Sequence, residues 1–102
     1  MDTFGEKIRK LRESLGLPLR KVSAFLDIDQ AILSKIERGQ RTAQREQVVK
    51  LALYFNSSKN DLLTSWLADK LLKEIENEEM GMQAINQAEN RHKQTVRKPN
   101  YK

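Results

Sequence analysis

The chain has 102 residues, of which 38% are hydrophobic and 32% charged, with no cysteine and a formal net charge of +5. This length and composition favour one folded helical domain over a disordered chain, and the lack of cysteine excludes disulfides and thiolate chemistry. The sequence has neither an apolar run long enough to span a bilayer nor a signal-peptide core, so we expect a cytoplasmic protein with no membrane partner.

The charges are distributed unevenly along the chain. Residues 1–60 hold 12 Lys and Arg against 7 Asp and Glu, residues 61–90 hold 2 against 7, and residues 91–102 hold 5 against none. A basic face favours nucleic acid as a partner, because Lys and Arg that neutralise phosphates release counterions. Net charge alone fits a solvated surface equally well, so the positions of the basic residues have to decide.

The first predicted helix covers residues 4–15. Its apolar residues recur at helical spacing and form one face: Phe4, Ile8, Leu11 and Leu15. Asp2 or Thr3 can cap its start, because a short polar side chain accepts hydrogen bonds from the first backbone N–H groups. Gly16 can end it.

Two further short helices are predicted, joined by a tight turn. Pro18 suits the first turn of a helix with an apolar face of Val22, Phe25 and Leu26. Asp29 can cap the next helix, and Gly39 can close it. Two short helices with one apolar face each and a tight turn between them form a helix-turn-helix, which we place at residues 18–39.

A fourth helix is predicted from Thr42 or Gln44, and a fifth from near Ser58 towards Asn77. Apolar residues cover two opposite sides of the fifth helix, whereas a surface helix normally has a single stripe. One side can face the rest of the domain, and the other needs separate cover. We favour a homodimer interface over capping by residues 80–90, and its expected residues are Leu63, Trp66, Leu67 and Leu71.

The C-terminal part is predicted to hold a short sixth helix around residues 80–88, interrupted by Gly81. The polar and basic composition of residues 91–102 predicts a disordered tail. The expected organisation is therefore a helix-turn-helix domain at 1–66, a helical extension for dimerisation or partner binding at 67–90, and the tail.

The helix that follows the tight turn carries the candidate site. If residues 30–38 are helical, one arc of roughly 140° holds amide, hydroxyl and cationic groups and no acid. These residues are Gln30, Ala31, Ser34, Lys35 and Arg38. Gln can pair with adenine, Lys can reach guanine and Ala fits the thymine methyl, but a solvated helix face explains the pattern as well.

An ordered series of motifs favours a base-reading face over a solvated helix face. It runs from Leu11-Arg12-Glu13 through Gly16-Leu17-Pro18-Leu19 and Ile28-Asp29 to Ile32-Leu33-Ser34-Lys35-Ile36-Glu37-Arg38-Gly39, with matching apolar positions as far as Leu62. The series resembles the Cro/C1-type (phage repressor, XRE) helix-turn-helix family. The resemblance implies an all-α, five-helix lambda-repressor-like domain, here with an added C-terminal helix and a disordered basic tail.

The resemblance also implies roles for the matching residues. Gln30, Ala31, Ser34 and Lys35 match base-reading positions. The positions that approach the DNA backbone or minor groove are Arg38, Gln40, Arg41 and Arg45. Leu19 replaces the usual backbone-contacting Gln, and Arg20 or Lys21 can take over that contact. Arg12 and Glu37 match a structural ion pair. Asp27 stands where the turn usually has Gly, and Asp tolerates the left-handed conformation better than most residues.

The function implied is a transcription regulator that binds double-stranded operator DNA as a homodimer and blocks or recruits RNA polymerase. The small size and the long helix after the domain are similar to controller proteins of restriction-modification systems. The alternative is an antitoxin that represses its operon and binds a toxin protein through its C-terminal segment. We expect no cofactor, no metal and no enzyme activity, because the only histidine, His92, has no partners for a triad or a zinc site.

Overall fold

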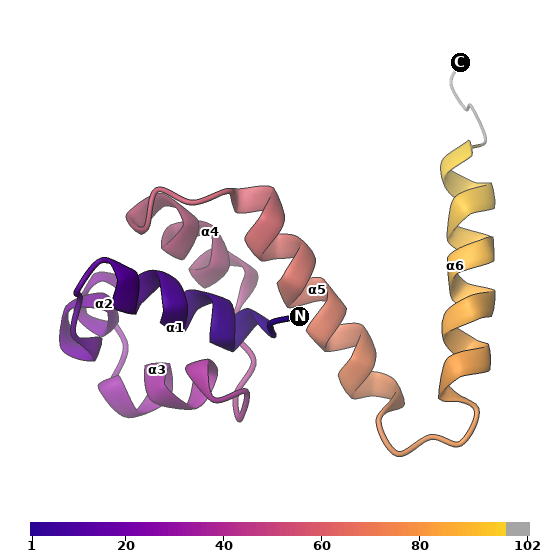
Figure 1. Cartoon of the computed structure of the whole chain (residues 1–102), viewed down its shortest axis with the longest axis horizontal. Helices are drawn as coiled ribbons and strands as arrows, with labels where there is room; N and C mark the ends of the chain where they lie inside the picture. Colours follow the sequence, from indigo (N-terminus) through magenta and orange to yellow (C-terminus); the bar gives the residue numbers. More distant parts are fainter. Residues whose placement is uncertain (98–102) are drawn as a thin grey trace. The chain divides into compact units, whose positions relative to one another are not determined.

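The computed structural model describes residues 1–97 and folds them into six helices (Figure 1). These are α1 (Phe4–Ser14), α2 (Leu19–Leu26), α3 (Gln30–Glu37), α4 (Arg45–Tyr54), α5 (Lys59–Ile75) and α6 (Gly81–Arg97). Residues 1–97 contain no strand, which confirms the predicted all-α class. None of their helices combines the length and the apolar composition that crossing a bilayer requires.

Local hydrogen bonds explain where α1 begins and ends. The Thr3 hydroxyl accepts a hydrogen bond from the Glu6 backbone N–H at 3.1 Å, and the Glu6 carboxylate accepts one from the Thr3 N–H at 2.9 Å. This reciprocal capping box satisfies two backbone donors at the helix start. Gly16 follows the helix with a φ of 67°, a left-handed conformation that costs glycine little.

The turn between α2 and α3 forms without a glycine. Asp27 adopts the left-handed conformation, with φ 59° and ψ 47°, and the Ile28 N–H donates to the Ser23 carbonyl at 3.0 Å. Two predictions need small corrections here. Pro18 is the N-cap of α2 and not its first residue, and Asp29 occupies the N-cap position of α3 without a side-chain hydrogen bond.

A single core joins α1 to α5 within the first unit of the chain, Met1–Leu71. Each of the five helices contributes to it, and the buried residues are Phe4, Ile8, Val22, Leu26, Leu33, Ile36, Ala43, Val48, Leu51, Ala52, Phe55, Leu62 and Trp66. Burial of Leu33 and Ile36 determines which side of α3 faces inward. The opposite side of α3 is therefore left at the surface.

The helices α1 and α3 are in close backbone contact at Gly5. A Cβ atom added there would lie 2.5 Å from the carbonyl oxygens of both Ile36 and Glu37. Both obstacles are backbone atoms, so no side chain can move aside to make room. The start of α1 thus rests directly on the C-terminal end of α3.

The first unit extends past the predicted boundary at residue 66. The Asp69 carboxylate accepts a hydrogen bond from the Phe4 backbone N–H at 2.9 Å, which ties this part of α5 to the start of α1. The C-terminal unit begins at Leu72 and holds the end of α5, a turn with Asn77 at φ 67°, and α6.

The helix α6 corrects two predictions about the C-terminal part. Gly81 is its first residue and does not interrupt it, and the helix continues to Arg97, so residues 91–97 are not a disordered tail. No glycine or proline follows until Pro99, and Lys93 pairs with Glu89 one turn earlier at 3.5 Å. The remainder of the predicted tail, residues 98–102, lies outside the described residues.

The close approach at Gly5 predicts that Gly5→Ala destabilises the domain by about 3 kcal/mol, because two backbone carbonyls must be displaced. Gly16→Ala is the matched control: its Cβ meets nothing within 4 Å, so only the positive φ of 67° is strained. We expect the control to lose about 1 kcal/mol. Urea unfolding followed by circular dichroism measures both, and equal losses would contradict the steric role of Gly5.

Candidate nucleic-acid interface

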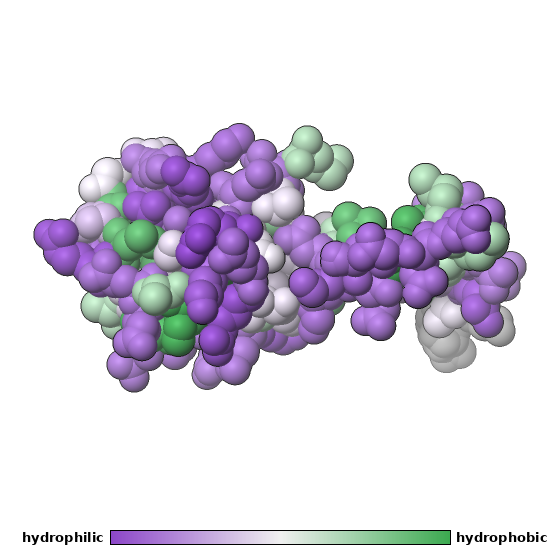
Figure 2. Space-filling view, turned by 90° about the horizontal axis from the view of Figure 1, so that it is seen from below, coloured by the Kyte–Doolittle hydropathy of each residue, from purple (hydrophilic) through white to green (hydrophobic). Residues whose placement is uncertain are grey.

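The outward side of α3 carries the four residues predicted to read bases: Gln30, Ala31, Ser34 and Lys35. We call this set the recognition face. Gln30, Ala31 and Lys35 are exposed and Ser34 is half-buried. Figure 2 views the molecule from the side on which α3 lies in Figure 1, and the surface of residues 1–71 seen there is mostly hydrophilic. The structure therefore brings all four residues together on an accessible polar surface.

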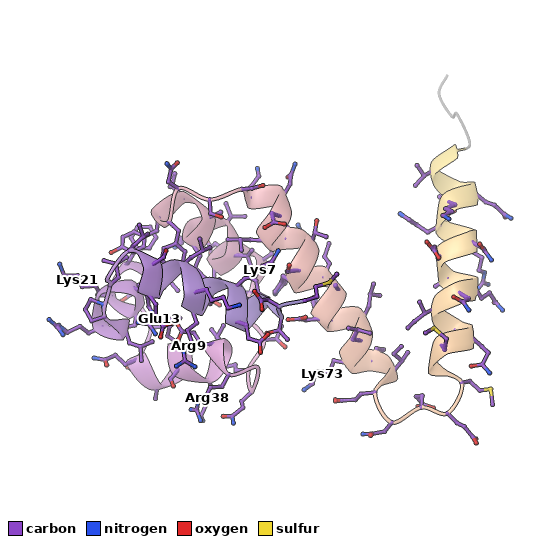
Figure 3. All side chains as sticks on the ribbon, in the orientation of Figure 1. Lys7, Arg9, Glu13, Lys21, Arg38 and Lys73 are labelled. Atoms are coloured by element: carbon purple, nitrogen blue, oxygen red, sulfur yellow. The ribbon has the colours of Figure 1, made fainter. Side chains whose placement is uncertain are left out.

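The residues predicted to contact the DNA backbone come from α2, the C-terminal end of α3, the α3–α4 loop and α4. Arg20 and Lys21 are in the first turn of α2, Gln40 and Arg41 are in the α3–α4 loop, and Arg45 is the first residue of α4. All are exposed. Lys21 and Arg38 project away from the bundle in Figure 3.

Ion pairing leaves these basic side chains available. Within residues 1–97, none of the ion pairs includes a residue that was predicted to contact DNA. Arg38 makes one local contact, a hydrogen bond from its Nε to the Ser34 carbonyl at 3.3 Å. Cations that are not already paired with carboxylates can neutralise phosphates, which is the main source of salt-dependent DNA affinity.

The structure brings Arg12 and Glu37 together in a bidentate ion pair beneath the recognition helix. Arg12 Nε lies 2.7 Å from Glu37 Oε2, and Nη2 lies 3.1 Å from Oε1. The third guanidinium nitrogen, Nη1, donates to the Leu17 carbonyl at 2.8 Å. The two side chains are only 11% and 6% exposed, so the pair is shielded from water. It joins α1, the α1–α2 loop and the end of α3.

The pKa of the Arg12 guanidinium is raised, mainly by its hydrogen bond with Glu37, while burial acts in the opposite direction. Because the folded state holds the Arg12 proton more tightly, the protonation of Arg12 stabilises the fold below the ordinary pKa of arginine. That contribution of Arg12 is lost as the pH rises through the raised value. The link between α1 and α3 therefore does not depend on the arginine changing charge near neutral pH.

The predicted dimer interface divides into buried and exposed residues. Trp66 is 5% exposed and donates from its indole Nε1 to the Ala43 carbonyl at 2.7 Å, so it is a core residue and its assignment to an interface was wrong. Leu63 is half-buried against the core. Leu67 and Leu71 are 43% and 71% exposed, so their side chains remain accessible for contact with a partner.

Two residues of α5 that sequence reasoning missed contribute to the first unit. Asp69 holds the start of α1, and Lys70 places its Nζ 4.4 Å from the centre of the Trp66 ring. Arg45 lies over the same ring, with its guanidinium carbon 5.2 Å from the centre. The spacing of Trp66 and Lys70, one helical turn apart, was the only signal for this contact in the sequence.

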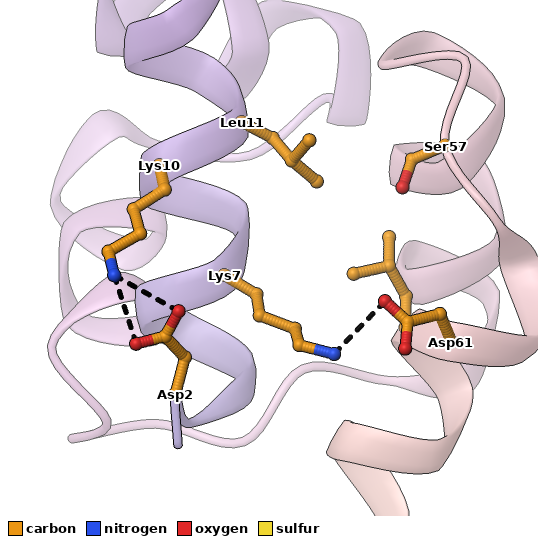
Figure 4. Close-up of a pocket in the computed structure, with 7 residues that line it drawn as sticks. Asp2, Lys7, Lys10, Leu11, Ser57 and Asp61 are labelled. Carbon is orange, nitrogen blue, oxygen red and sulfur yellow. Dashed lines mark hydrogen bonds and ion pairs between the residues drawn. The ribbon is translucent and has the colours of Figure 1, made fainter.

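A surface pocket of about 260 Å³ lies between α1 and the start of α5 (Figure 4). Its charged groups compensate each other: Lys7 pairs with Asp61 at 3.0 Å, and Lys10 pairs with Asp2 at 3.1 Å. Among residues 1–97, no three His, Asp or Glu side chains are grouped to hold a metal ion. The pocket lies apart from the predicted DNA-contacting residues.

Comparison with known proteins finds a matching family. A family model described as a helix-turn-helix domain matches residues 5–65, which include α1 from its second residue, α2 to α4, the recognition face and the first part of α5. No curated protein matches the chain. The matched range ends before Trp66 and before the exposed residues Leu67 and Leu71.

The buried ion pair predicts strong coupling between Arg12 and Glu37 in stability. Glu37→Leu or Arg12→Met alone should cost about 3–5 kcal/mol, because each leaves a buried charge without its partner. The double variant should lose much less than the sum of the two single losses. Urea unfolding of the four proteins measures this cycle, and additive losses would show that the pair contributes nothing specific.

Proposed function

This chain belongs to the helix-turn-helix domain family and is a DNA-binding transcription regulator, and from this premise we propose that it is of the XRE type and recognises a two-fold operator as a homodimer. Each subunit inserts α3 into the major groove, with half-sites about 34 Å apart. Bound near a promoter, the dimer blocks or recruits RNA polymerase.

The observation that carries this proposal is the surface position of Gln30 and Lys35 on one exposed face of α3. Both side chains can make bidentate hydrogen bonds to base edges, Gln to adenine and Lys to guanine. Exposed basic residues also lie on α2, in the α3–α4 loop and on α4. They supply contacts that orient the protein on DNA without specifying sequence.

The homodimer is supported by the exposed leucines of α5. Leu67 and Leu71 are one turn apart, so they share a side of the helix, and the core of residues 1–71 does not cover them. Exposed apolar side chains grouped in this way are typical of protein–protein contacts. A two-fold contact through α5 would relate two recognition helices by the symmetry of an inverted-repeat operator.

Within this class we favour a controller of a restriction-modification system, on the basis of the helix that continues beyond the matched domain. The exposed apolar residues of α6 support the alternative function as an antitoxin. Met82, Ile85 and Val96 are 66%, 39% and 61% exposed, and they could contact a toxin protein. Purification with a tightly bound second protein would favour the antitoxin, whereas a homodimer that regulates its own promoter would favour the controller.

Selection of random duplex DNA by the purified full chain, near physiological salt and with the mass of the complex measured in parallel, tests the proposed function. We expect an enriched inverted repeat with half-sites one helical turn apart, bound by two chains. A folded protein that enriches no sequence would contradict sequence-specific regulation.

The two kinds of DNA contact should respond differently to mutation. Lys35→Ala should lose about 1–3 kcal/mol of discrimination at one base pair, because it removes a base-reading group. Arg41→Ala should weaken binding to all sequences alike and reduce the salt slope by about 1, because it removes a phosphate contact. Affinities for the selected operator and its single-base variants, measured over a salt series, separate the two. Identical effects of both substitutions would contradict the assigned roles.

The proposed interface predicts that Leu67→Lys combined with Leu71→Lys raises the dimer dissociation constant by about tenfold or more, because two apolar contacts are lost. Leu53→Lys on α4 is the matched control, since Leu53 is also apolar and is 78% exposed. Sedimentation equilibrium measures the dimer dissociation constant of the wild type, the double variant and the control. A control that dissociates as readily as the double variant would place the interface elsewhere.

A further inference from the structure

The indole of Trp66 contacts two parts of the chain that meet the predicted DNA surface. Its Nε1 donates a hydrogen bond of 2.7 Å to the carbonyl of Ala43, near the end of the loop that also carries Gln40 and Arg41. Its ring lies under the guanidinium of Arg45, the first residue of α4. A single buried side chain therefore contacts both the α3–α4 loop and the basic residue that follows it.

The arrangement over the ring suits a cation that also binds an anion. A guanidinium attracted to an aromatic ring interacts through the ring face, while the N–H groups at its edges remain able to donate. Arg45 is exposed, so these edges are accessible from solvent. Holding the long side chain in place also removes part of the rotamer entropy that an arginine loses when it binds a phosphate.

Lys70 adds a second cation at the same ring, at 4.4 Å from its centre. It is exposed, and no ion pair within residues 1–97 involves either Lys70 or Arg45. Two cations thus lie within 5.2 Å of the centre of one aromatic ring, and within residues 1–97 neither has a carboxylate partner. This local concentration of positive charge favours a phosphate as the ligand.

We propose that Trp66 is a positioning residue for DNA-backbone binding, which it serves by holding Arg45 and Lys70 ready for a phosphate and by fixing the α3–α4 loop through Ala43. This inference rests on the proposed function, and it adds Lys70 to the residues that contact the backbone. It also gives Trp66 a role that its burial in the core does not by itself require, since an aliphatic side chain could fill the same space.

A double-mutant cycle tests the proposal with the full chain and a duplex of random sequence as the probe. Arg45→Ala is combined with Trp66→Leu, and affinity is measured over a salt series for the four proteins. In the wild type, Arg45→Ala should weaken binding and flatten the salt dependence. With Trp66→Leu, the further effect of Arg45→Ala should be smaller by about threefold or more, because the ring no longer holds the cation.

Lys21→Ala is the matched control, since Lys21 is an exposed basic residue on α2. It should weaken binding by the same factor with and without Trp66→Leu. If Arg45→Ala likewise has the same effect in both backgrounds, Trp66 has only a structural role and the proposal is overturned. Should Trp66→Leu fail to fold, Trp66→Met replaces it in the cycle, because a methionine fills more of the space in the core and still removes the ring.

Fluorescence provides an independent readout, because Trp66 is the only tryptophan of the chain. DNA should change its emission in the wild type by drawing Arg45 towards a phosphate, and the change should be much smaller in Arg45→Ala. Equal changes in both proteins would count against the proposal. A wild type that binds DNA without any sequence preference would refute the proposed function and leave this test intact, whereas a wild type that binds no duplex would refute both.

Discussion

The orientation of the recognition face depends on one buried interaction, the bidentate ion pair between Arg12 and Glu37. Glu37 is the last residue of α3, and its carboxylate accepts two hydrogen bonds from the Arg12 guanidinium. The same guanidinium also donates to the Leu17 carbonyl. The α3 helix has only eight residues, too few to be stable by itself. The ion pair and the contact at Gly5 together lock its C-terminal end onto α1, so the opposite face has a defined direction.

The helix α5 gives the same surface a second support. Asp69 satisfies a backbone donor at the start of α1, and Trp66 holds the Ala43 carbonyl close to the start of α4. The side chains proposed to read bases and those proposed to contact phosphates are thus anchored to the same unit, residues 1–71, through different contacts. Such anchoring lowers the entropy lost on binding, which is how a small domain can obtain useful affinity from few contacts.

The first unit is complete without the apolar residues at the end of α5. Its core ends at Trp66, and the leucines beyond it remain largely exposed. Exposed leucines do not stabilise the isolated chain, so their presence is best explained by a surface that is covered on association. In the proposed dimer, a second copy of the chain covers these leucines.

The sequence by itself determined the features that depend on neighbouring residues. The start of α1 near Thr3, the tight turn at Asp27 and the side of α3 that carries Gln30 and Lys35 depend on residues a few positions apart, so the sequence predicts them. It left open whether Asp2 or Thr3 caps α1. Tertiary structure alone decided that Trp66 belongs to the core, since cores and interfaces both require apolar residues. It also decided the roles of Gly5 and Asp69, because their partners lie far along the chain and are brought close only by the packing of the helices.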